Sequence, residues 1–327
     1  MKSPPSHLTQ SSHGVCASIT ALIGCLMLNS TAHASDLPAI NLGSTTFYDG
    51  APLPGGSGWY GSLFLNHYEA RKITDNDGQR IGLPKSRVSV DTTTLQLIYQ
   101  GEGGPLHSDW GFSALLPVVT RLQVDDGLNN AALDGQAGIA DLNFGWYLQF
   151  KPIMGANGPI FAQRVELDFV APLGRYERST AINPGANFWS VNPYWAGTYW
   201  ATPATTVSWR LHYLWNAKNT APSPATYGAD VSDVQAGQAV HANFNVLYAL
   251  TPQFKVGLNG YWLNQISVSR IDGHKASGRR EKAFAIGPGA MYAFSAHDSV
   301  MANVYFETES RNRPEGNRFN LRWIHKL

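Results

Sequence analysis

The fold is decided by Asn317-Arg318-Phe319-Asn320-Leu321-Arg322-Trp323-Ile324-His325-Lys326-Leu327, the last eleven residues of the chain. From Phe319 to Leu327 every second side chain is apolar, aromatic or histidine, and most of the intervening positions are polar. A period of two is typical of a β-strand with one apolar and one polar face. An aromatic-bearing strand at the C-terminus is expected of the closing strand of a transmembrane β-barrel.

The N-terminal residues predict export. A polar stretch with one charged residue, Lys2, precedes an apolar run from Val15 to Leu28, and Ala32-His33-Ala34 then forms a small-x-small cleavage pattern. The apolar run is shorter than the ~20 residues of a membrane helix, so we predict a signal peptide over residues 1–34. Leu22-Ile23-Gly24-Cys25 resembles a lipoprotein processing site, but the apolar run continues beyond it, which favours the ordinary signal.

Cysteine content and charge narrow the class of protein. Cys16 and Cys25 both lie in the leader, so we expect no disulfide and no cysteine metal site in the exported chain. Of the 24 basic residues only Lys2 lies in the leader, and the remaining 23 balance the 23 acidic residues. This balance gives no support to nucleic-acid binding. The remaining classes are a large soluble β-protein and an outer-membrane barrel.

Alternating segments recur along the chain about twelve times, at the spacing expected of barrel strands. The predicted strands are Trp59–Arg71, Arg87–Gln100, Asp109–Val119, Ala137–Phe150, Ile160–Ala171, Ser190–Ala201, Ala204–Asn216, Ala236–Leu250, Phe254–Ser269, Ala283–Ser295, Ser299–Ser310 and Asn317–Leu327. An even number of strands is typical of single-chain bacterial barrels. Pro193 falls inside one segment, where it removes a ladder hydrogen bond, so the count is open by two.

The connections between these segments alternate in length. The long connections are Lys72–Ser86, Thr120–Gln136, Pro172–Trp189, Ala217–Gln235 and Arg270–Lys282. The short connections are Gly101–Ser108, Lys151–Pro159, Thr202-Pro203, Thr251-Pro252 and Ala296–Asp298. Outer-membrane barrels have long extracellular loops and short periplasmic turns, which predicts both termini on the periplasmic side. The last long-side connection, Arg311–Gly316, is shorter than the others.

Each segment has one apolar and one polar face, as in Leu142, Phe144, Trp146 and Leu148 against Asn143 and Gln149. The sequence does not say which face points outward, so a soluble sandwich or barrel with an apolar interior is the alternative. Tryptophan and tyrosine near strand ends and the length of the strands favour the membrane barrel. We therefore predict an all-β fold, a transmembrane antiparallel β-barrel of about 12 strands with an N-terminal signal peptide.

The segment before the first strand has no alternation and is rich in turn residues, as in Asp49-Gly50-Ala51-Pro52. We therefore divide the chain into a signal peptide (1–34), an N-terminal segment (35–58) that is a lumen plug or a periplasmic tail, and the outer-membrane barrel (59–327).

Several motifs carry a resemblance to a known family. They are Ile40-Asn41-Leu42-Gly43, Phe47-Tyr48-Asp49-Gly50, Asn187-Phe188-Trp189-Ser190-Val191-Asn192-Pro193-Tyr194, Gly257-Leu258-Asn259-Gly260-Tyr261-Trp262 and Arg313-Pro314-Glu315-Gly316-Asn317-Arg318-Phe319-Asn320-Leu321-Arg322-Trp323. In these motifs the chain, over essentially its whole exported length, resembles the outer-membrane family named for the meta-pathway of phenol degradation. The resemblance implies uptake of hydrophobic or aromatic compounds in a Gram-negative bacterium. It supplies no binding residues.

The candidate site is the polar face of the strands, because ionisable groups at membrane depth face protein or water and often mark a pathway. The candidate lumen-lining residues are Asp141, Arg164, Glu166, Asp168, Arg210, His212, Lys255, Tyr261, Tyr305, Glu307 and Arg322. Interior charges also form ion-pair networks that brace a barrel wall, and bracing is the alternative role for these residues. Tyrosines such as Tyr147 could contact aromatic solutes, although interior filling is the commoner reason for them.

Catalytic and metal sites are not expected. Asp75-Asn76-Asp77-Gly78 and Asp125-Asp126-Gly127 lack the later ligands of a calcium loop and are typical of turns. His107-Ser108-Asp109 is adjacent in sequence, but successive strand residues point to opposite faces, and no Gly-x-Ser-x-Gly elbow occurs. We predict no catalytic, cofactor-binding or metal-binding residue and no cofactor.

The sequence thus predicts a porin-like bacterial outer-membrane transporter for passive uptake of small hydrophobic or aromatic compounds. Its expected partners are outer-membrane lipid and the solute, with no nucleic acid; the oligomeric state is open. A charged lumen fits poorly with a purely apolar solute, so lateral release through the wall, or an organic acid as substrate, stays open. The alternative is a structural or adhesive barrel with functional outer loops, and an outer-membrane lipase or protease is disfavoured.

Overall fold

A computed structural model describes residues 36–44 and 47–327 of the chain, so the predicted signal peptide, residues 1–34, lies outside the described residues. Twelve antiparallel strands form one closed barrel, as the alternation predicts. They are β1 (Gly58–Ile73), β2 (Arg87–Gly101), β3 (Ser108–Asp125), β5 (Leu142–Phe150), β7 (Gly158–Ala171), β9 (Tyr194–Thr202), β10 (Thr205–Asn216), β13 (Ala239–Ala249), β14 (Phe254–Gln265), β17 (Lys282–Ala293), β18 (Asp298–Arg311) and β19 (Pro314–Lys326).

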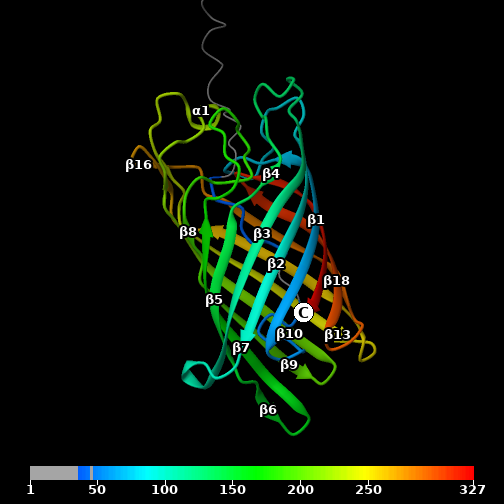
Figure 1. Cartoon of the computed structure of the whole chain (residues 1–327). Helices are drawn as coiled ribbons and strands as arrows, with labels where there is room; N and C mark the ends of the chain where they lie inside the picture. The colour runs from blue at the N-terminus through cyan, green and yellow to red at the C-terminus, as the bar shows by residue number, and fades with distance from the viewer. Residues whose placement is uncertain (1–35, 45–46) are drawn as a thin grey trace, which may run out of the picture. The chain divides into compact units, whose positions relative to one another are not determined.

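The barrel closes between its first and last strands. Each strand pairs with the next along the chain, and β1 pairs with β19 in a register that places Leu63 opposite Trp323. Closure leaves no edge with unpaired backbone groups, which is the requirement for a sheet that spans a membrane. Figure 1 shows the strands running obliquely around the wall.

Except for the short turn between β18 and β19, the connections alternate in length as predicted, and the two kinds lie at opposite ends of the barrel (Figure 1). The long ones carry short elements: β4 (Gly138–Ile139), β8 (Ser190–Val191), β11 (Lys218–Asn219), α1 (Pro224–Tyr227), β12 (Val234–Gln235), β15 (Ser269–Ile271) and β16 (His274–Ala276). The short ones carry η1 (Pro105–His107) and β6 (Ile153–Gly155). We name the end with the long connections the outer end and the other the inner end.

Several predicted boundaries were wrong: β3 continues to Asp125 rather than ending at Val119, and β5 begins at Leu142 rather than Ala137. Two further differences involve proline. The segment predicted as Ser190–Ala201 is divided into β8 and β9, because Pro193 has no N–H to continue the ladder. The last strand begins at Pro314 rather than Asn317, with Pro314 opposite Ile73. Proline is tolerated as the first residue of a strand, so β18 and β19 are joined by a two-residue turn, 312–313.

The apolar face points outward. Leu95 is 57% exposed, Trp146 53% and Leu258 55%, whereas inward-facing Asn243, Asn303 and Asn320 are almost fully buried. Apolar outside and polar inside is the arrangement of an outer-membrane barrel and the reverse of a soluble one. No helix in the described ranges is long and apolar enough to cross a membrane.

Candidate functional site

A cavity of about 780 Å³ lies inside the barrel, between the strands and the chain that precedes β1. Its strand lining includes Phe64, Gln96, Leu115, Arg164, Glu166, Asp168, Tyr194, Arg210, Lys255, Met291, Arg318 and Arg322. The preceding chain contributes Ile40, Asn41, Phe47, Tyr48, Asp49, Leu53 and Pro54. Residues 294–297, in the turn after β17, also line the cavity, so it reaches the inner end.

The chain before β1 is held against the inner face by hydrogen bonds to distant side chains. Gly43 donates its N–H to Asn243 Oδ1 at 2.7 Å, and its carbonyl accepts from Asn320 Nδ2 at 2.8 Å. Gly50 donates to Thr198 Oγ1 at 3.0 Å and accepts from Gln149 Nε2 at 3.0 Å. Because this chain has no ladder of its own, lumen side chains satisfy its backbone groups.

Two glycines allow this close approach. A Cβ on Gly50 would lie 2.6 Å from backbone atoms of Gly197 and Thr198 on β9. Gly43 has φ +73°, and a Cβ there would lie 2.9 Å from Tyr305 and 3.1 Å from Tyr261. Gly50 is thus required because there is no space for a side chain. Gly43 is required for the same reason and because its φ is positive.

A belt of charges lies beside the cavity. Arg210 Nη2 is 3.1 Å from Asp49 Oδ1, and its guanidinium lies 4.4 Å from the Tyr194 ring centre. The Tyr194 hydroxyl donates to Glu166. Arg164 donates from Nε to Gln149 Oε1 at 2.9 Å and lies over the Tyr147 ring.

Arg322 completes this belt on β19. It donates from Nε to Ser62 Oγ at 2.9 Å and from Nη2 to Gln96 Oε1 at 3.0 Å, with its guanidinium over the Phe64 ring. Arg164, Glu166, Asp168, Arg210, Lys255 and Arg322 all line the cavity, so six of the eleven candidate residues are brought to one place.

Three other candidates form a closed layer nearer the outer end. Glu307 accepts from the Tyr261 and Tyr68 hydroxyls, each at 2.7 Å, and from the Gly316 N–H at 2.8 Å. Tyr305 packs on Tyr261 with ring centres 5.2 Å apart. A carboxylate that accepts three charge-assisted hydrogen bonds from three different elements ties them together, so this layer has the character of a brace.

The remaining two candidates lie elsewhere. His212 stacks on His241, with ring centres 4.1 Å apart, and both are almost fully buried. Asp141 precedes β5 and accepts the N–H groups of Gly174 and Ala186, so it fastens an outer loop.

At the outer end the chain before β1 contacts the long connections. Asp36 Oδ2 accepts from Arg279 Nε at 3.0 Å, and Asp36 Oδ1 accepts from the Tyr227 hydroxyl at 2.9 Å. Burial, and then the charge of Asp36, raise the pKa of Tyr227 well above its usual value, so this hydroxyl keeps its proton and donates. At the inner end Lys326 Nζ and the Tyr60 hydroxyl each donate at 2.6 Å, to the carbonyls of Gly55 and Gly56.

A second cavity, of about 610 Å³, lies against the lipid-facing side of the wall next to Pro193. Its apolar lining is Trp146, Leu148, Val165, Leu167, Trp195, Leu211, Tyr213 and Val240. Glu166 and Tyr194, which line the central cavity, also line this one. The two cavities are therefore adjacent where proline interrupts the ladder.

Sequence reasoning missed the amide side chains that hold the preceding chain, namely Gln149, Asn243 and Asn320. Alternation places them on the polar face, but a search for charged and aromatic groups passes over amides. Across the two described ranges, no group of three or more His, Cys, Asp or Glu side chains is placed to hold a metal ion.

Comparison with known proteins agrees with this geometry. No curated protein matches the chain. An outer membrane channel from Pseudomonas putida F1 is 18% identical with a TM-score of 0.75, covering 86% of this chain and 100% of the channel. The translocator domain of the autotransporter NalP from Neisseria meningitidis is 10% identical with a TM-score of 0.49, covering 83% of this chain and 89% of that chain. A FadL homologue from Pseudomonas aeruginosa is 11% identical with a TM-score of 0.39, covering 86% and 93%.

The first of these likenesses shows the fold of an outer-membrane barrel. The assignment to a family rests on the sequence profile, which matches residues 70–323. The chain belongs to the family described as "Putative MetA-pathway of phenol degradation".

Proposed function

We propose that this protein is an outer-membrane channel for the passive uptake of small hydrophobic or aromatic compounds, without catalysis. The central cavity is the observation that carries the proposal. Apolar and aromatic groups such as Phe47, Tyr48 and Met291 line it together with a few charged groups. Sites for small apolar ligands combine an apolar lining with a few placed polar groups. Membership of the phenol-degradation family supports the same solute class.

We further propose that residues 35–58 act as a plug, after export and cleavage of residues 1–34. Contacts at its described residues support this role: Asp36 is fastened at the outer end, Gly43 and Gly50 within the lumen, and Gly55 at the inner end. The charges beside the cavity then have two tasks. Arg210 fastens the plug through Asp49, and Arg164, Lys255 and Arg322 contact the solute.

The plug restricts a straight path through the lumen, and we propose lateral release through the wall at Pro193 as the route for apolar solutes. The support is that Glu166 and Tyr194 line both the central cavity and the lipid-facing cavity. A solute that passes between these cavities avoids transfer into bulk water, which is the costly step for an apolar compound.

Liposome swelling with the purified, refolded protein tests the channel. Swelling should be faster with phenol-like aromatics and small organic acids than with sugars. The release of a fluorescent aromatic compound into the bilayer, measured in the same vesicles, reports the lateral route. Failure of both readouts, from protein that keeps its heat-resistant mobility on gels, would contradict transport and favour a structural or adhesive barrel.

A further inference from the structure

A patch of exposed basic side chains lies on three neighbouring strands of the barrel wall. At the outer end of β1, β2 and β3, Arg71, Arg87 and Arg121 are exposed, and Lys85 is exposed just before β2. By contrast β5, β7, β9, β10, β13 and β14 carry no exposed charged side chain. On the remaining wall strands the exposed charged side chains are Lys282 on β17 and Glu309 and Arg311 on β18, so three of the five exposed basic side chains of the wall strands lie together on β1, β2 and β3.

The patch lies next to the exposed apolar side chains of the wall, on the side towards the outer end. On β1 the outward-facing side chains towards the outer end are exposed Leu65, then His67, Glu69 and Arg71. On the antiparallel strand β2 they are exposed Leu95, then Asp91 and Arg87. A bulge between Asp91 and Thr92 puts Arg121 of β3 opposite Asp91. In a membrane barrel this level is the headgroup region of the outer leaflet.

Acidic residues hold the arginines in place. Glu69 Oε1 lies 3.0 Å from Arg71 Nε and 3.3 Å from Arg87 Nε, and Asp91 lies 3.8 Å from Arg121 and 2.6 Å from His67. Exposed ion pairs contribute little to stability, so folding alone does not account for them. Each guanidinium has five N–H donors, and these contacts use only some of them.

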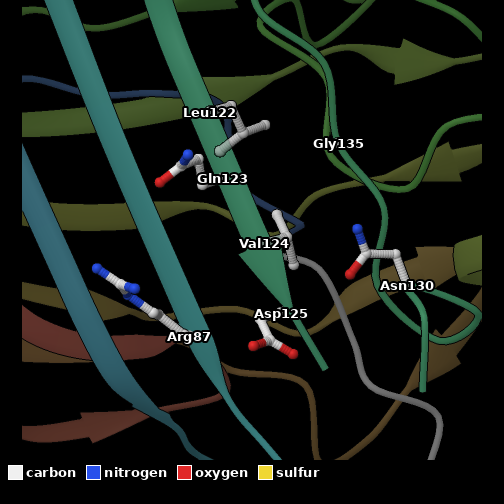
Figure 2. A pocket seen from close by; sticks show the side chains of 7 residues that line it. All are labelled: Arg87, Leu122, Gln123, Val124, Asp125, Asn130 and Gly135. Atoms are coloured by element: carbon white, nitrogen blue, oxygen red, sulfur yellow. The ribbon is translucent and has the colours of Figure 1, made fainter. Parts of the chain in front are cut away.

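A pocket of about 390 Å³ adjoins the patch. Figure 2 shows Arg87 on β2 and Gln123 and Asp125 on β3, with Asn130 and Gly135 on the loop that arches beside them. Asp126 fixes this loop by accepting N–H groups from Leu128, Asn130, Ala132 and Leu133. The concavity is therefore preorganised.

We propose that this patch binds the phosphate group of a glycolipid in the outer leaflet. Arginine forks match phosphate oxygens in a bidentate manner, and clusters of basic residues at a membrane surface bind anionic headgroups. The ion pairs of the patch contain four cations and three carboxylates, namely Arg71, Lys85, Arg87 and Arg121 with Glu69, Asp91 and Asp125. These pairs therefore have an excess of one positive charge, which a bound phosphate would compensate. The inference does not depend on the solute that the channel carries.

Native mass spectrometry of the whole protein in detergent, with a defined bisphosphorylated glucosamine lipid, tests this site. The double variant Arg87→Gln/Arg121→Gln should bind this lipid roughly 30-fold more weakly, since each arginine near a lipid surface supplies about a fivefold gain. The matched control is Lys282→Gln, an exposed cation on β17. The enzymatically dephosphorylated lipid should bind the original protein as weakly as the double variant binds the phosphorylated lipid.

Equal binding by the double variant, equal binding of the dephosphorylated lipid, or self-association of the protein through this patch would each overturn the proposal. Heat-resistant mobility on gels verifies that the variants are folded. Should the double variant fail to fold, Arg71→Gln provides the same comparison, because that side chain is 78% exposed.

Discussion

Arg210 on β10 and Asp49 in the chain before β1 form an ion pair across 161 positions of sequence, with Nη2 and Oδ1 3.1 Å apart. The Asp49 side chain is 1% exposed and that of Arg210 15%. Removing one partner of a buried pair leaves the other charge uncompensated, at a cost of about 3–5 kcal/mol. This pair therefore makes a large contribution to holding the segment before β1 against the wall.

Asp49→Asn should loosen the plug and raise the ion conductance of single channels in planar bilayers. Part of the lost ~3–5 kcal/mol should increase the fraction of channels in which the plug is displaced, and the rest should lower the unfolding temperature. The control is Glu177→Gln, which breaks the exposed pair with Arg175 and should change neither quantity. Conductance equal to that of the original protein would mean that Asp49 does not retain the plug.

Gly50→Ala should act on the same segment through sterics. The added Cβ would lie 2.6 Å from the backbone of β9, which cannot move without breaking its ladder, so the plug must shift. We expect increased conductance and increased proteolysis of the segment before β1. Gly82→Ala is the control, because nothing lies within 4 Å of a Cβ there. A docked, protease-resistant plug in Gly50→Ala would contradict this account.

The strands could be predicted from sequence, and the position of the N-terminal segment could not. Strands such as β10 carry their signal locally, in alternation that two faces of different polarity impose. The segment before β1 has no period, and its partners, such as Asn320 for Gly43, lie up to 277 positions away. A backbone that is satisfied by distant side chains leaves no pattern in its own residues.

The candidate site divides in the same way. Alternation placed Arg164, Glu166 and Asp168 on the inner face, where they line the cavity. It also suggested Asp141, which lies just before β5 and binds loop amides. Periodicity shows which face of a strand a residue lies on, but it does not show where the strand begins. Because β5 begins at Leu142, Asp141 belongs to the loop and not to the lumen wall.

The outer loop after β3 should lose its ordered conformation when the pH falls low enough to protonate Asp126. Burial disfavours the Asp126 carboxylate, but backbone hydrogen bonds outweigh this effect and lower its pKa from 3.8 to about 2. A lowered pKa means that the stabilisation is complete above pH ~4 and is lost as the pH falls through about 2. The protection factors of the amides at residues 128–133, taken relative to intrinsic exchange at the same pH, should be high at pH 5 and low near pH 2.

Asp126→Asn should make those amides exchange rapidly at neutral pH, because Asn keeps one acceptor oxygen and places an NH2 donor against two of the four N–H groups. Asp77→Asn, in the turn after β1, should leave residues 128–133 unchanged. Slow exchange in the Asp126 variant would show that other contacts hold the loop.

Arg164→Ala should alter solute flux more than folding. Arg164 lines the cavity and donates to Gln149, whose amide in turn donates to the Gly50 carbonyl, so its loss changes both the lining and the support of the plug. Swelling rates with an aromatic acid should fall relative to those with a neutral aromatic of the same size. Unchanged flux with lost heat resistance would instead support a bracing role.

The lateral route predicts that fixing the wall at Pro193 will stop apolar solutes and not ions. Phe169 on β7 and Val191 on β8 are register partners beside the interruption, and residues 35–327 contain no cysteine. The variant Phe169→Cys/Val191→Cys, once oxidised, should lose most transfer of a fluorescent aromatic compound into the bilayer, and reduction should restore it. Ion conductance should stay unchanged, because ions do not cross the wall. Val207→Cys/Val246→Cys joins register partners on β10 and β13 as the control. Equal transfer by the oxidised and reduced forms of the Pro193 variant would exclude this seam, and the solute path would then run past the plug to the inner end.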